Sequence, residues 1–438
     1  MIFNFQIGSF SNLQISTFAF FTFYLTMIHF ERTKLANGLT VIVHQDQTTP
    51  MVAVDVCYNV GSRDEHPDRT GFAHLFEHLM FGGSKNIPSY DEPLQKAGGD
   101  NNAFTSNDLT NYYLTVPKNN LETGFWLESD RMLELAFSKS SLDVQRNVVI
   151  EEFKQRQLNQ PYGDVWPLLR QLAYKVHPYQ WPTIGREISH IEQATMQQVK
   201  DFFFAHYAPD NAVLVVTGDV DFNEVVKLAE RWFGPIPNRN VKPRNIPQEP
   251  VQKEIREQTV IRDVPNDTIY MAYHMAGRLD PVYFATDLVS DVLSNGNSSR
   301  MYKNLVQKKK LFTELDAYLS GDYEPGLFVV SGKPSDGISL ETARIEIEKE
   351  LESMKQDLVS DYELEKVKNK LEATIVYGEM NYLTKAMNLA TNEVLDDASL
   401  INSQVESYRS VDVEQIREVS QQIFRPENCS VLYYHAKK

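Results

Sequence analysis

Hydrophobic and polar residues alternate regularly from residue 30 onward, and this pattern predicts a strand-rich start to the folded chain. The alternating stretches 30–36 and 39–44 flank Asn37-Gly38, a pair typical of the tight turn between two antiparallel strands. Residues 51–59 carry valines at every second position, which predicts a third strand with one buried face. In residues 71–81 the spacing of apolar residues changes to that of a helix, and two glycines end the stretch.

The same patterns continue to about residue 233. They predict strands at residues 108–116 and 211–217 and helices at residues 121–135, 141–159 and 223–233. Residues 235–250 then hold five prolines, at a density that neither a helix nor an inner strand accepts. We therefore interpret residues 235–250 as an extended linker between two domains.

Beyond the linker the pattern starts again. It predicts strands at residues 268–274, 328–332 and 430–435, and helical stretches at residues 281–293, 298–309, 341–358, 362–395 and 413–423. Residues 52–83 and 270–296 share the order of strand, turn, helix and glycine, which indicates a divergent repeat. The fold class that follows is α+β, with two structurally similar domains, each a mainly antiparallel sheet with helices on one face.

These patterns also set the expected domain boundaries. Residues 27–234 form the first domain, residues 235–250 the linker and residues 251–438 the second domain. Residues 1–26 precede the second methionine and contain no Lys or Arg, so they lack the basic start of a signal peptide. We interpret residues 1–26 as an upstream extension, with a weak signal peptide or membrane anchor as the alternative. A cytoplasmic protein is therefore expected, and a periplasmic or membrane-associated one if the alternative holds.

Composition excludes several classes of protein. The chain has 438 residues, of which 42% are hydrophobic; this is ample for a large core, and the length favours two or three domains. The formal net charge of −16 disfavours binding to nucleic acid or to an anionic membrane. The two cysteines, Cys57 and Cys429, are too few for a disulfide scaffold or a cysteine-based zinc site.

Residues 74–78 carry the clearest chemistry, because they read His-Leu-Phe-Glu-His within a predicted helix. His74 and His78, four positions apart, share one helical face and can bind a single Zn²⁺ ion at about 2.0–2.1 Å. Glu77 projects from the same side and can move a proton from attacking water to a leaving amine. A buried histidine pair beside a solvated acid is the plainer alternative. The order HxxEH is that of an inverted zinc-peptidase motif, and it predicts a metallopeptidase.

A catalytic zinc needs a third protein ligand, and residue patterns alone leave its identity open. None of the other histidines stands at an obvious spacing from the motif. The adjacent acids Glu151 and Glu152, on an apolar predicted helix, are candidates. From the residue pattern alone, a solvated helix face is the simpler interpretation of that pair.

The sequence resembles the pitrilysin/insulinase family of zinc peptidases, in particular the two-domain branch that includes the mitochondrial processing peptidase. The resemblance extends over nearly all of residues 28–438. It rests on these motifs: residues 35–39 (LANGL), 61–63 (GSR), 71–82 (GFAHLFEHLMFG), 147–152 (NVVIEE), 177–179 (HPY), 184–185 (IG) and 218–220 (GDV).

This resemblance implies roles for particular residues. His74 and His78 would be zinc ligands, Glu77 the catalytic base and Glu152 the third ligand of one zinc ion per chain. Glu151 takes that place if the register is shifted by one. An acid that supports the site in the family is replaced here by Gln145, an uncharged amide.

The resemblance also implies how a peptide substrate binds. Residues 99–105 match an edge strand to which the substrate adds as a further strand, with Asn102 and Ala103 as contact residues. Without the resemblance, a turn that leads into a strand is the simpler interpretation of this stretch.

Relatives in this family also supply an Arg and, seven residues later, a Tyr that steady the substrate and the oxyanion. Those positions hold Val306 and Thr313 here. The chain is therefore expected to work with a homologous metal-free subunit in a heterodimer, or as a homodimer. The alternative function is that of a non-catalytic subunit of a processing or respiratory complex with the same fold.

Overall fold

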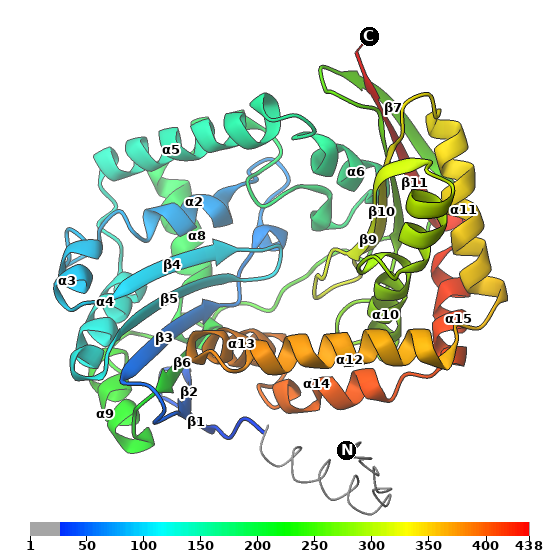
Figure 1. Cartoon of the computed structure of the whole chain (residues 1–438). Coiled ribbons are helices and arrows are strands. Elements are labelled where there is room, and N and C mark those ends of the chain that lie inside the picture. The colour runs from blue at the N-terminus through cyan, green and yellow to red at the C-terminus, as the bar shows by residue number, and fades with distance from the viewer. Residues whose placement is uncertain (1–26, 438) are drawn as a thin grey trace, which may run out of the picture.

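Two β-sheets, one from each half of the chain, form the framework of the protein (Figure 1). The computed structural model describes residues 27–437. The expected extension or signal at residues 1–26 lies outside the described residues. Within residues 27–437, no helix is long and apolar enough to cross a membrane.

The first sheet has six strands in the order β1-β2-β6-β3-β5-β4. Its strands are β1 (Glu31–Lys34), β2 (Thr40–Gln45), β3 (Met51–Tyr58), β4 (Asp100–Thr105), β5 (Thr110–Pro117) and β6 (Ala212–Gly218). Only β2 and β6 run parallel to each other, and the other neighbouring strands are antiparallel. β4 is therefore an edge strand with one free side.

The helices of the first half carry the candidate site. They are α2 (Phe72–Leu79), α3 (Asp91–Lys96), α4 (Leu121–Leu133), α5 (Lys139–Phe153), α6 (Val165–Ala173), α7 (Ile188–Glu192), α8 (Met196–His206) and α9 (Phe222–Trp232). A π-helical turn, Lys154–Asn159, continues α5 directly.

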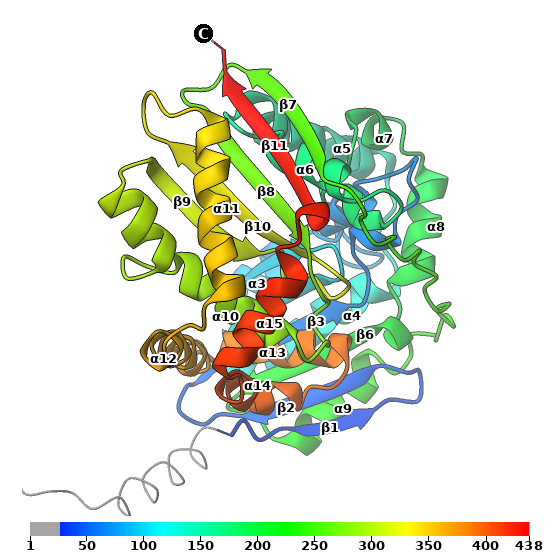
Figure 2. The same ribbon diagram turned by 90° about the vertical axis from the view of Figure 1, so that its right-hand side faces the viewer.

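The second sheet repeats the arrangement of the first, in the order β7-β11-β8-β10-β9 (Figure 2). Its strands are β7 (Arg256–Arg262), β8 (Thr268–His274), β9 (Phe312–Leu319), β10 (Leu327–Pro334) and β11 (Cys429–Ala436). The one parallel pair, β7 with β11, corresponds to β2 with β6. The predicted α+β class with two similar units is thus confirmed.

The prediction covers the helices of the second half except for residues 400–409, and it joins two of them into one stretch. They are α10 (Tyr283–Ser294), α11 (Leu340–Gln356), α12 (Asp361–Gly378), α13 (Tyr382–Leu395), α14 (Leu400–Arg409) and α15 (Val413–Ile423), with a π-helical turn at Tyr302–Lys308. The predicted stretch 362–395 is two helices, because the Asn381 side chain accepts the first backbone N–H groups of a new helix from Leu383 and Thr384.

Each sheet is covered on its second face by a helix from the opposite half of the chain. Ala53, Cys57 and Val215 of the first sheet pack against Leu389 and its neighbours on α13. On the second sheet, α6 of the first half packs against the face that carries residues such as Val329. The expectation of helices on one face therefore holds within each half, and the exchange of α6 and α13 joins the halves.

The interdomain connection is extended, and it is fastened to the first half. Residues 239–255 contain no helix or long strand. Arg244 pairs with Asp64, and the Glu249 carboxylate accepts the backbone N–H of His177 at 3.0 Å. A second fastening joins the turn after β4 to the β9–β10 connection, where Asp108 accepts the N–H of Tyr323 at 2.9 Å. We keep 27–234, 235–250 and 251–438 as our proposed boundaries.

Candidate metal centre

Helix α2 is held at its N-terminus by a buried carboxylate that lies outside the motif. Its N-cap residue, Gly71, adopts a left-handed conformation and offers no side chain as a cap. Glu65 replaces such a cap, because its two oxygens accept the N–H groups of Gly71 and Ala73, each at 2.8 Å. This pair of bonds fixes the start of the helix that carries His74 and His78.

One face of α2 is anchored in the core of the first half. Phe72, Leu75, Phe76 and Leu79 are all buried there. The helix therefore cannot rotate without exposing these side chains to water. The opposite face presents the two histidines and Glu77 toward α5 and β4.

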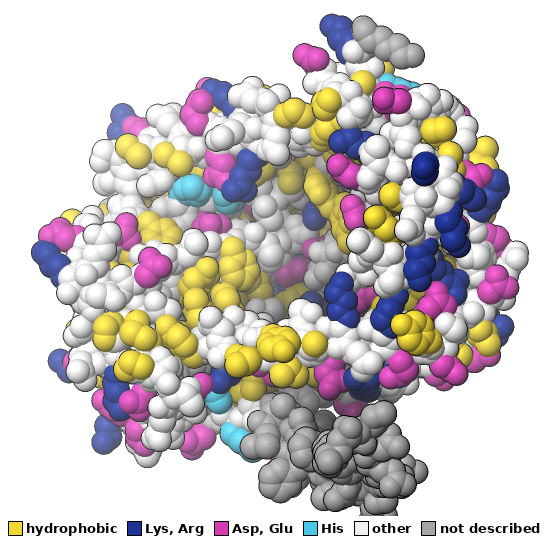
Figure 3. Space-filling model, viewed as in Figure 1, with side chains coloured by type: hydrophobic (Ala, Val, Ile, Leu, Met, Phe, Trp, Pro, Cys, Tyr) yellow, Lys and Arg dark blue, Asp and Glu magenta, His cyan; other side chains and the backbone are white. Residues whose placement is uncertain are grey.

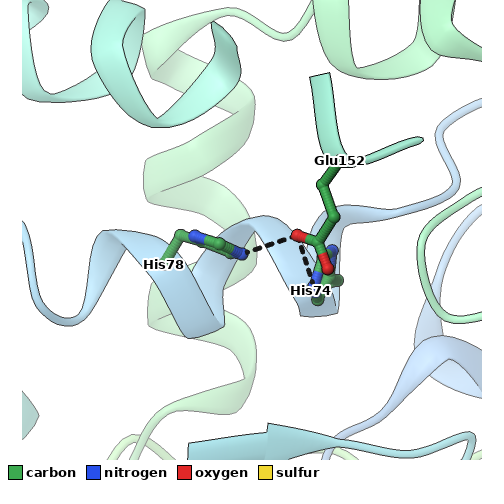
Figure 4. Close-up of side chains that lie close together, drawn as sticks. All are labelled: His74, His78 and Glu152. Atoms are coloured by element: carbon green, nitrogen blue, oxygen red, sulfur yellow. Dashed lines mark ion pairs between the residues drawn. The ribbon is translucent and has the colours of Figure 1, made fainter. Parts of the chain in front are cut away.

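Helix α5 brings Glu152 to the two histidines (Figure 4). Glu152 Oε2 lies 3.5 Å from Nε2 of His74 and 3.3 Å from Nε2 of His78. Candidate ligand atoms of the three residues all lie within 4.8 Å of one another. In residues 27–437 this is the one group of three or more His, Cys, Asp or Glu side chains with such a spacing.

The adjacent Glu151 lies away from this group. Its carboxylate pairs with Lys154 at 2.7 Å, and 72% of the side chain is exposed, compared with 19% for Glu152. Of the two candidate acids, Glu152 is thus the one that faces the histidines. The π-helical turn begins two residues later, and Arg156 within it contacts the other oxygen of Glu152 at 2.8 Å.

The separation of the three groups suits a zinc ion. Two ligand atoms about 2.1 Å from a tetrahedral zinc ion lie about 3.4 Å apart, close to the distances between Glu152 and each histidine. Burial lowers the pKa of His74 to about 4, which favours the neutral imidazole that binds metal. The hydrogen bond with His78 lowers the pKa of Glu152, which favours its carboxylate form.

Supporting contacts around the histidines are sparse. The Nδ1 atom of His74 is buried and has no hydrogen-bond partner among the described residues. Gln145, about two helical turns before Glu152 on α5, stands where the family resemblance places a supporting acid. Within residues 27–437 no hydrogen bond joins its amide to either histidine, so Gln145 does not orient the ring of His74 through the buried Nδ1 atom.

Glu77 lies beside the metal group and is held from the neighbouring strand. Its Oε2 accepts a hydrogen bond from Oγ1 of Thr105, at 2.6 Å. Burial raises the pKa of Glu77, which brings it closer to the range of a general base at neutral pH. Thr105 and Glu65 were both missed by the sequence analysis, because neither stands at a telling spacing from the motif.

The predicted substrate residues lie on β4, the free edge of the first sheet. The Ala103 side chain packs against the core, so only its backbone faces a partner. The Ala103 N–H donates to Oδ1 of Asn102, its own neighbour, at 2.8 Å. The surface seen in Figure 3 is hollowed between the two halves of the chain, and histidine side chains lie at the margin of this hollow.

The helix of the second half that corresponds to α2 has no metal group. Gly83 and Gly296 both have positive φ and follow α2 and α10, respectively. Counted back from these glycines, His74 and His78 correspond to Asp287 and Asp291. Asp287 accepts a hydrogen bond from Tyr408 and Asp291 one from Asn295, so both acids have structural partners.

Comparison with known protein families accounts for both halves. Residues 40–187 match the family described as Insulinase (Peptidase family M16), and residues 193–371 match the Peptidase M16 inactive domain. The chain belongs to the M16 peptidase family. The M16 assignment agrees with a metal group in the first half and none at the corresponding helix of the second.

Several M16 relatives match the chain over most of its length. Zinc protease PqqE of Helicobacter pylori is 29% identical over 411 residues, which is 92% of each chain. An uncharacterized zinc protease of Bacillus subtilis, YmxG, is 24% identical over 92% of this chain and 97% of its own. The sequence resemblance is thereby confirmed, and the chain is a zinc protease of the M16 family.

Solved structures agree with this fold. The crystal structure of a protease from Helicobacter pylori has a TM-score of 0.87 and 27% identity, and the match covers 93% of this chain and 100% of that one. Pitrilysin has the same fold at a TM-score of 0.76 and 19% identity, but the match covers only 45% of its chain. This chain therefore corresponds to about half of pitrilysin.

Proposed function

We propose that this M16 protease is a zinc metalloendopeptidase in which His74, His78 and Glu152 hold one zinc ion. The observation that carries the proposal is the convergence of Glu152 from α5 with both histidines of α2. When bound, zinc would supply a Lewis acid that polarises the scissile carbonyl and activates water. One ion per chain follows from the single group of this kind in the described residues.

Glu77 is the proposed general base. It is one residue from His78 on the same helix, and its carboxylate lies beside the metal group. Glu77 takes a proton from the attacking water and passes it to the leaving amine. The surrounding burial favours this exchange, because it raises the pKa of Glu77.

The substrate is proposed to bind as an extended strand along β4. The free edge of β4 offers backbone groups to a peptide, and this pairing requires an unfolded segment. The Ala103 N–H now donates to Oδ1 of Asn102. A substrate carbonyl that pairs with this N–H must therefore displace the Asn102 side-chain oxygen. Asn102 then becomes free to bond the substrate itself.

Removal of the metal tests the activity directly. A chelator is expected to abolish cleavage of an internally quenched peptide, and added Zn²⁺ to restore it at about one ion per chain, because the donor set holds one ion. Activity and zinc content are measured on the same samples. Zinc binding without cleavage, under any partner condition, would instead favour a non-catalytic subunit.

We further propose that full activity needs a second chain of the same fold. Val306 lies in the π-helical turn before β9, and Thr313 on β9 donates to the backbone oxygen of Lys333. Val306 has no polar group, and Thr313 carries an aliphatic hydroxyl. The two residues therefore provide neither a cation nor a phenol to stabilise the oxyanion. A homologous metal-free chain that carries an Arg and a Tyr at these positions would supply both.

The expected result is low activity of the purified chain alone and a marked gain when that homologue is added. Each missing oxyanion donor costs about 10²–10³ in rate, so the gain is expected in kcat. Peptidase assays with and without the homologue are combined with the mass of the species in solution. A fully active monomer would overturn this part of the proposal, and a homodimer without added activity would show that closure alone is insufficient.

A further inference from the structure

Thr105 contacts the proposed base Glu77, but neither metal binding nor strand pairing with the peptide requires this contact. It is the last residue of β4, and its hydroxyl donates to Oε2 of Glu77 at 2.6 Å. That distance is typical of a strong hydrogen bond between a hydroxyl group and a carboxylate. Within residues 27–437 it is the hydrogen bond that ties the Glu77 side chain to another element.

The position of Thr105 follows from the pleat of the strand. Side chains two residues apart lie on the same face, so Thr105 shares the face of Ala103, which packs against the core beside α2. Phe104, between them, points the other way and is 38% exposed. This alternation directs the threonine side chain toward α2, whereas the free edge of β4 follows from its place at the end of the sheet.

The backbone on either side of Thr105 is fixed. Thr105 pairs with Thr110 in β5, and the Thr110 hydroxyl donates to the carbonyl of Val60. The turn that follows is closed by the Ser106 N–H, which donates to the carbonyl of Leu109 at 2.9 Å. Two residues later, Asp108 pairs with Arg63 at 2.9 Å. Thr105 is thus a rigid donor, whereas a free glutamate side chain has three rotatable bonds.

We propose that Thr105 is a positioning residue for Glu77. By holding Oε2, it leaves Oε1 for the attacking water and selects one orientation of the carboxylate. Because Thr105 belongs to β4, the base is held by the same strand with which the peptide pairs. The strand that pairs with the peptide therefore also fixes the orientation of the base. This inference rests on the proposed function of Glu77.

The test compares three variants in the zinc-loaded protein. Thr105→Val keeps the shape and removes the hydroxyl, Thr105→Ser keeps the hydroxyl, and Thr115→Val is the matched control. Thr115 lies on neighbouring β5, is half-buried and forms no side-chain hydrogen bond within the described residues. Kinetics are measured with a quenched peptide, and zinc content and thermal unfolding on the same preparations.

Thr105→Val is expected to lower kcat roughly 10- to 100-fold, the range for one hydrogen bond to a charged group. KM, zinc content and the unfolding midpoint are expected to stay near those of the wild type. Thr105→Ser should retain kcat within about threefold, and Thr115→Val should be unchanged. Equal losses in the Ser and Val variants, or a loss confined to KM or to zinc content, would overturn the inference.

Crystal structures of the variants give a readout that does not depend on activity. The Glu77 carboxylate should keep its orientation in Thr105→Ser and lose it in Thr105→Val. If Glu77 keeps its orientation in Thr105→Val, the inference is contradicted, whatever the activity of that variant. Failure of the proposed function would look different, because the zinc-loaded wild type would not cleave the peptide with or without the homologous chain, whatever the orientation of Glu77.

Discussion

Glu77→Gln is expected to lower peptide hydrolysis by about two to four orders of magnitude while zinc stays bound. The substitution keeps the size of the side chain and its ability to accept the hydrogen bond from Thr105. It leaves His74, His78 and Glu152 unchanged, so the metal should remain at about one ion per chain. Only the capacity to accept and pass on a proton is lost.

The comparison requires zinc content and kcat from the same preparation. A variant with full zinc and no turnover separates proton transfer from metal binding. Substantial turnover by Glu77→Gln would show that another group deprotonates the water. A loss of zinc instead would mean that Glu77 helps to hold the metal, which the present geometry does not require.

Glu152→Ala is expected to empty the metal site, whereas Glu151→Ala should leave it filled. An open catalytic site depends on three protein ligands, and two imidazoles alone bind zinc weakly. The loss of affinity should exceed the roughly 10- to 100-fold that removal of a supporting residue costs. Glu151 makes only an exposed ion pair with Lys154, which contributes little.

These two variants control for each other, because they remove the same side chain from adjacent positions of α5. Zinc titration of the metal-free proteins measures the affinity, and circular dichroism checks that α5 stays folded. If Glu151→Ala lost the metal and Glu152→Ala kept it, the ligand assignment would move by one residue. Equal zinc affinity in both variants would require a third ligand from elsewhere.

The metal helix could be recognised from the sequence because its information is local. Two histidines four positions apart lie on one face of any helix, and the apolar residues between them show which face is buried. The same holds for the strands with regular alternation, such as β3 and β8, whose predicted and observed bounds nearly coincide. The repeat of strand, turn and helix was visible for the same reason.

Edge strands and surface helices were harder to predict. Strand β7 carries charged residues at exposed positions and only one buried side chain, Val260, so its alternation is weak. Strand β9 likewise has exposed polar residues along an edge of the second sheet. Their strand conformation depends on pairing with β11 and β10, which the local pattern does not specify.

The local pattern of residues was enough to predict the helix that carries His74 and His78 and the two-unit α+β plan, because each depends on neighbours a few positions apart. Tertiary structure decided everything that joins distant segments. It placed Glu152, and not Glu151, beside the histidines, and it brought the Thr105 hydroxyl to Glu77. It also exchanged α6 and α13 between the halves. These contacts depend on how helices and sheets pack, and a one-residue rotation of α5 would have turned a different acid toward the metal site.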